Sequence, residues 1–78
     1  MARYTYLWDF FGPQARPTAE HFERHLLQFI EREGLAECAT GTRSEQAGHV
    51  ACYVVSDEVN EAALVRALKP ARKLEPVE

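Results

Sequence analysis

The chain has 78 residues, of which 46% are hydrophobic and 27% charged, and its formal net charge is −3. This length allows one domain over residues 1–78, and the composition is that of a soluble globular protein rather than a disordered segment. The acidic balance counts against nucleic acid as a partner, and no apolar run reaches the ~20 residues that span a bilayer, so we expect a cytoplasmic protein.

The first predicted element is a strand over residues 3–10, where β-favouring Tyr, Thr and Trp alternate with other residues. A loop rich in glycine and proline follows and ends at Pro17. Five aromatic side chains lie within eight residues: Tyr4, Tyr6, Trp8, Phe10 and Phe11. Because successive side chains of a strand point to opposite faces, the even-numbered aromatic residues share one face, and Arg3, Thr5 and Leu7 share the other.

The longest helix is predicted over residues 18–34. Thr18 can cap its N-terminus, Glu20 suits its first turn, and Gly34 stands where a C-cap glycine is expected. Apolar residues recur at intervals of three and four, as on the buried face of a helix: Ala19, Phe22, Leu26, Phe29 and Ile30.

Two strands are predicted next, over residues 35–41 and 49–56, around a polar turn at residues 42–48. In the second of these strands, His49 is expected to be exposed. After it, side chains alternate between two uncharged faces, which carry Val50, Cys52 and Val54 on one side and Ala51, Tyr53 and Val55 on the other. Both faces should therefore be covered by something.

A second helix is predicted over residues 57–69, capped by Ser56 or Asp57 and ended by Pro70. The remaining segment, residues 69–78, allows two interpretations. It forms a short edge strand through Leu74 and Val77, with Pro76 near its end, or it frays.

This order of elements, βαββα with an optional fourth strand, predicts an α+β fold. We expect a two-layer, ferredoxin-like sandwich in which both helices cover one face of an antiparallel sheet. The first strand is central if the fourth strand forms. Otherwise it is an edge strand, which is an aggregation hazard unless a partner covers it.

The pattern does not decide whether the aromatic face of the first strand lies under the helices. In either orientation the open face of the sheet is more apolar than a solvated surface should be. One explanation is ordinary core packing, with Tyr53 half-exposed on the sheet. A second is a homodimer that buries the open face or the first strand's edge. A third is base stacking on Tyr4, Tyr6 and Tyr53, but the third strand lacks the motif of RNA-recognition sheets.

Histidine and cysteine spacing suggests a metal site, which helical geometry argues against. His21 and His25 lie off the apolar stripe of their helix, whereas Cys38 and Cys52 lack a C-x-x-C spacing and are expected inside. The two histidines alone could bind a metal ion adventitiously or contact a partner, although a solvated helix face explains them as well. The cysteines are expected to be free thiols, with a disulfide conceivable only if the hairpin turn centres on Glu45.

Catalytic motifs and cofactor fingerprints are missing from the sequence, so no cofactor is expected. Asp9 is the one acidic residue flanked by aromatic residues. Burial there would raise its pKa and suit it to acid–base chemistry, although such an aspartate more often caps a loop. Phe11 is expected to pack under the long helix, or to form the rim of a pocket with Trp8.

Our leading hypothesis is a small, non-enzymatic module that self-associates as a homodimer and binds a small ligand or protein of unknown kind. The alternative is a small enzyme with a site around Trp8, Asp9, Phe11 and His21. Single-stranded nucleic-acid binding on the sheet is a weaker alternative. The candidate ligand or interface residues are Trp8, Asp9, Phe11, His21, His25 and Tyr53.

Overall fold

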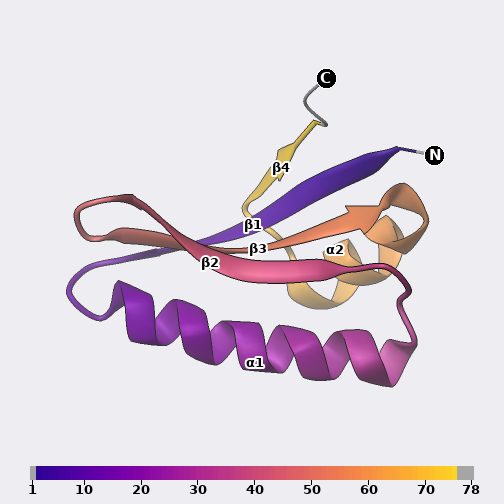
Figure 1. Ribbon diagram of the computed structural model, residues 1–78, viewed down its shortest axis with the longest axis horizontal. Coiled ribbons are helices and arrows are strands. Elements are labelled where there is room, and N and C mark those ends of the chain that lie inside the picture. Colours follow the sequence, from indigo (N-terminus) through magenta and orange to yellow (C-terminus); the bar gives the residue numbers. More distant parts are fainter. Residues whose placement is uncertain (1, 76–78) are drawn as a thin grey trace.

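The computed structural model describes residues 2–75 and has one open, four-stranded antiparallel sheet with two helices (Figure 1). Its elements in chain order are β1 (Arg3–Phe11), α1 (Ala15–Glu33), β2 (Ala39–Gln46), β3 (His49–Asp57), the 3₁₀ turn η1 (Glu58–Asn60), α2 (Glu61–Leu68) and β4 (Arg72–Leu74). The strand order is β2-β3-β1-β4, which makes β1 and β3 the central strands. The predicted α+β class is therefore confirmed.

The aromatic face of β1 lies under the helices. Tyr6 and Trp8 are buried in the same core as Leu26 and Phe29 of α1 and Leu64 of α2. The polar atoms of both rings reach α2: Tyr6 Oη donates to Glu61 Oε1 at 3.0 Å, and Trp8 Nε1 donates to the carbonyl oxygen of Leu68 at 2.8 Å. Buried Tyr and Trp side chains need such partners, so these two bonds fix the orientation of β1.

Helix α1 begins at Ala15, three residues before the predicted Thr18 cap. Pro17 lies in its first turn, where a missing N–H costs nothing because those groups have no intrahelical acceptor. The prediction of a loop up to Pro17 was therefore wrong. The other end agrees with expectation, since Gly34 adopts the left-handed conformation of a C-cap at φ 67°.

The β2–β3 hairpin is tighter than the sequence suggested. Most of residues 42–48, predicted as a turn, belong to β2, and the turn itself is Ala47–Gly48. Gly48 has φ 73°, a conformation that glycine adopts without the steric cost of a Cβ atom. With this register Cys52 is paired with Thr42, while Cys38 precedes β2, so the two cysteines are not opposite each other and both are free thiols.

The C-terminal part forms the fourth strand. Asp57 caps the second helical segment as expected, accepting from the backbone N–H of Val59 at 3.2 Å, although this segment opens with η1. After α2, β4 pairs with β1 through Thr5–Leu74 and Leu7–Arg72, so β1 is not an edge. Pro76 and Val77 lie outside the described residues. Within residues 2–75, none of the helices has both the length and the apolar character that crossing a bilayer requires.

Candidate functional site on the open sheet face

The open face is the side of the sheet turned away from α1 and α2. Its central residues, Leu7 and Ala51, are fully buried although no described helix covers them. The pairing explains this for Leu7, which lies between Tyr53 of β3 and Arg72 of β4. Around this centre is a half-buried or exposed row that we call the apolar row: Thr5, Tyr53, Val55 and Leu74.

The outer end of the Tyr53 ring lies over Gly41 of the neighbouring strand β2. A Cβ atom at position 41 would lie 2.5 Å from Tyr53 Oη and 2.7 Å from Cζ, so the ring occupies the space above Gly41 that a side chain would need. Glycine in a strand often marks such a close approach. The ring therefore adds a broad aromatic surface to the open face.

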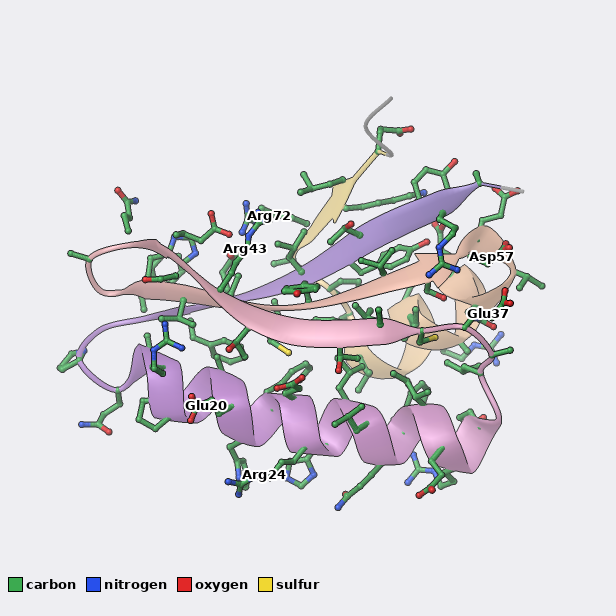
Figure 2. All side chains as sticks on the ribbon, viewed as in Figure 1. Glu20, Arg24, Glu37, Arg43, Asp57 and Arg72 are labelled. Carbon is green, nitrogen blue, oxygen red and sulfur yellow. The ribbon has the colours of Figure 1, made fainter. Side chains whose placement is uncertain are left out.

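At the hairpin end of the open face, polar side chains with ionisable groups from all four strands meet. We call this the Asp9 network, and it consists of Asp9, Arg43, Glu45, His49 and Arg72. Arg72 donates two hydrogen bonds to Asp9, from Nη2 to Oδ1 at 2.6 Å and from Nε to Oδ2 at 2.9 Å. His49 Nε2 lies 2.8 Å from the same Oδ1. Figure 2 shows Arg43 and Arg72 close together on the side of the sheet opposite α1.

An irregularity in β2 brings Glu45 into the network. The pairing passes from Ser44–Val50 to Gln46–His49, which leaves Glu45 as the extra residue of a β-bulge. Bulges redirect side chains. Glu45 Oε2 accepts from Arg43 Nε and lies 3.4 Å from Arg72 Nη2, so each arginine of the network faces a carboxylate.

The network holds Asp9 as a carboxylate. Burial by itself would raise the pKa of Asp9, but the hydrogen bonds from Arg72 and His49 outweigh it and hold that pKa below its ordinary value. The prediction that burial among aromatic residues raises the pKa of Asp9 was therefore wrong. With a lowered pKa, Asp9 is a poor proton donor. Because a carboxylate only accepts hydrogen bonds, the proton in the His49 contact is on Nε2.

Two neighbours of Asp9 lie differently from expectation. Phe11 is 70% exposed and stacks on the His49 ring at 4.4 Å between centroids, instead of packing under the long helix. The His49 side chain is only 14% exposed, because it lies between Phe11 and Asp9. The expected exposure of His49 was therefore wrong.

The structure does not bring the residues of the hypothetical enzyme site together. Trp8 is in the core, whereas Asp9 and Phe11 are on the open face, since adjacent residues of a strand point to opposite sides. His21 and His25 are exposed on α1, in the other layer. Tyr53 is on the open face, as the alternation of β3 suggested.

Sequence reasoning missed four members of the Asp9 network: Arg43, Glu45, His49 and Arg72. Glu45 was placed in a turn, and Arg72 in a segment of uncertain structure. A signal was nevertheless present, because Arg3 and Asp9 share the face opposite Trp8. Charges at both ends of that face would have identified it as the outer one.

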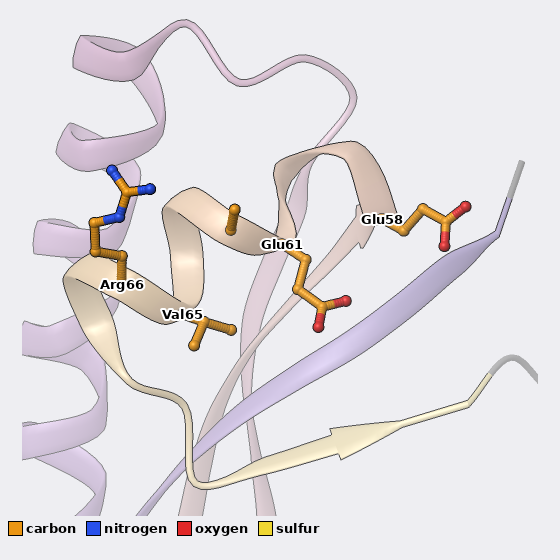
Figure 3. Close-up of a pocket in the computed structure, with 5 residues that line it drawn as sticks. Glu58, Glu61, Val65 and Arg66 are labelled. Atoms are coloured by element: carbon orange, nitrogen blue, oxygen red, sulfur yellow. The ribbon is translucent and has the colours of Figure 1, made fainter.

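A second surface feature is a depression on α2, lined by Glu58, Glu61, Ala62, Val65 and Arg66 (Figure 3). It is shallow and open to solvent, and it carries charges of both signs. No group of three or more His, Cys, Asp or Glu side chains within residues 2–75 is arranged to hold a metal ion. The open face is therefore the better candidate.

In comparisons with known proteins, no family model, curated protein or solved structure matches this chain.

Proposed function

We propose that the protein is a small, non-enzymatic module that self-associates as a homodimer through its open face. The observation that carries this proposal is the apolar row, which has no covering layer within residues 2–75. Apolar surface of this kind gains free energy when it is removed from water. The strand order β2-β3-β1-β4, with both helices on one face, supports the finer inference of a ferredoxin-like plan.

Charges on the open face favour a second copy over a charged partner. In the Asp9 network two arginines compensate two carboxylates, so this end is close to neutral. Arg3 lies at the other end and donates to the carbonyl oxygen of Glu37 at 2.9 Å. A face with internally compensated charges does not repel its own copy, whereas a nucleic acid would need a net positive surface.

The size of the open face indicates a small interface. The four strands contain 9, 8, 9 and 3 residues. With about 3.3 Å per residue and about 4.8 Å between strands, the face covers roughly 460 Å². Two copies would bury roughly 900 Å², near the lower limit of about 1,000 Å² for a specific interface. We therefore expect a weak dimer with a Kd on the order of micromolar.

The other two hypotheses have less support. The hypothesis of base stacking required three exposed tyrosine rings on one face of the sheet. Tyr4 and Tyr6 are on the helical side, and only Tyr53 is on the open face. The hypothesis of acid–base catalysis required Asp9 as the proton donor, and the lowered pKa of Asp9 makes it unsuited to that role.

Tyr53→Glu tests the proposal by sedimentation velocity. The variant should keep the wild-type circular dichroism spectrum, because Tyr53 is not part of the helical core, and should be monomeric where the wild type dimerises. Burying an unpaired carboxylate from each copy costs several kcal/mol, enough to abolish a weak dimer. The matched control is Gln28→Glu, which adds the same charge on exposed α1 and should leave the dimer intact.

A second interface variant, Thr5→Lys, tests the same surface independently, in case a substitution at position 53 prevents folding. If both folded variants dimerise like the wild type, the open face is not the interface. If Gln28→Glu dissociates the dimer as strongly as they do, overall charge rather than the open face controls association.

A further inference from the structure

His21 and His25 form a close pair on the solvent side of α1. Their Nε2 atoms are 3.0 Å apart, and the rings meet edge to face with 4.6 Å between centroids. Both residues are exposed and lie one turn apart within a 19-residue helix, so a regular backbone fixes their spacing. Neither side chain contributes to the core or to the open face.

The distance between the two Nε2 atoms is in the range found between two nitrogens that bind the same metal ion. Imidazole nitrogens bind divalent metals at about 2.0–2.1 Å. Two nitrogens 3.0 Å apart then subtend an angle of roughly 90–97° at the metal. This is the angle between neighbouring positions of a tetragonal or octahedral complex, the geometry typical of Ni²⁺ and Cu²⁺. A tetrahedral Zn²⁺ would need the nitrogens about 3.3–3.4 Å apart.

We propose that His21 and His25 form a bidentate site for a divalent late-transition-metal ion, with Ni²⁺ and Cu²⁺ preferred over Zn²⁺. Both imidazoles bind the metal through Nε2 in the neutral form, and the proton of the donating Nε2 moves to Nδ1 of the same ring. Small ring rotations that keep the two Nε2 atoms about 3.0 Å apart then direct both lone pairs to one point. Since residues 2–75 offer no third ligand, water fills the remaining positions.

The surroundings of the pair limit its affinity. Arg24 lies between the two histidines in sequence and, like them, is exposed on the solvent side of α1 (Figure 2). A neighbouring cation weakens metal binding by like-charge repulsion. The site is on the layer opposite the open face, so it does not depend on the proposed dimer.

Isothermal titration of the untagged full-length chain with NiCl₂ and with ZnCl₂ tests this site. The wild type should bind one Ni²⁺ per chain, more tightly than Zn²⁺. His21→Gln and His25→Gln should each weaken Ni²⁺ binding at least about tenfold, because the second ligand of a chelate binds at high effective concentration. The control, Arg24→Gln, keeps both ligands and should bind Ni²⁺ at least as tightly as the wild type.

Two results would overturn the inference. If His25→Gln binds Ni²⁺ with the wild-type affinity and stoichiometry, the metal is held elsewhere on the chain. If Zn²⁺ binds more tightly than Ni²⁺, the preference derived from the 3.0 Å separation is incorrect. Circular dichroism of each variant confirms that an exposed substitution on α1 has left the helix intact.

Discussion

Asp9→Asn perturbs the Asp9 network with little change of shape. The substitution removes the carboxylate that accepts two bonds from Arg72 and one from His49. The side chain at position 9 is 13% exposed, so water cannot fully replace the lost acceptor. Because Arg72 joins β4 to the rest of the sheet, the loss should weaken the attachment of this three-residue strand.

The magnitude follows from the contacts. A hydrogen bond to a charged group contributes about 1.5–3 kcal/mol, but the Arg72 side chain is 37% exposed and retains Glu45, so the lower end applies. We expect Asp9→Asn to lower the free energy of unfolding at pH 7 by about 2 kcal/mol. For a domain of this size, that corresponds to a fall in Tm of roughly 10 °C.

The effect of Asp9 on stability should depend on pH in a defined direction. Its pKa is lower in the folded protein than in the unfolded chain, so ionised Asp9 stabilises the fold. This stabilisation is complete well above the unfolded value of about 3.9, and it is lost as the pH falls through the lower folded value. The stability difference between wild type and Asp9→Asn should therefore shrink below about pH 4.

Urea denaturation followed by circular dichroism at pH 7 and pH 3 measures both effects. The matched control is Glu20→Gln, which removes a carboxylate from an exposed pair with Arg16 at 3.9 Å and should cost at most about 0.5 kcal/mol. A pH 7 loss no larger than that of the control, or a loss that is the same at pH 3, would refute the role assigned to the Asp9 network.

Two further predictions concern the fold. Trp8→Phe removes the Nε1 donor to the Leu68 carbonyl and part of the core volume, so the free energy of unfolding should fall by about 2 kcal/mol in urea titrations; unchanged stability would mean that this bond does not hold α2. Gly48→Ala places a Cβ atom in the left-handed region at φ 73° and should cost about 1 kcal/mol in the same assay; a stabilised variant would contradict the turn conformation.

Local signals in the sequence predicted the elements better than their boundaries. The helical periodicity, the C-cap at Gly34 and the cap at Asp57 are each specified by neighbouring residues, and all three are present. The start of α1 and the hairpin turn were misplaced. Pro17 was assigned to the loop before the helix, although the first turn of a helix accepts proline. The polar residues of β2 resemble a turn because they lie on an edge strand.

The candidate site depended on contacts between distant residues. Asp9 meets Arg72, which is 63 positions away in the sequence, only because β4 pairs with β1 in one register. Hydrophobic periodicity does not specify that register for a strand of three residues. The orientation of β1 was left open, although the charges of Arg3 and Asp9 exclude their shared face from the helical core.

Sedimentation equilibrium of the wild-type chain, from about 1 µM to about 1 mM, is the most direct test of self-association. If the open face pairs with its own copy, the weight-average mass should rise with concentration from the monomer value of 8.9 kDa toward twice that value, with a midpoint on the order of micromolar. A mass that stays at the monomer value over the whole range would contradict the proposed function.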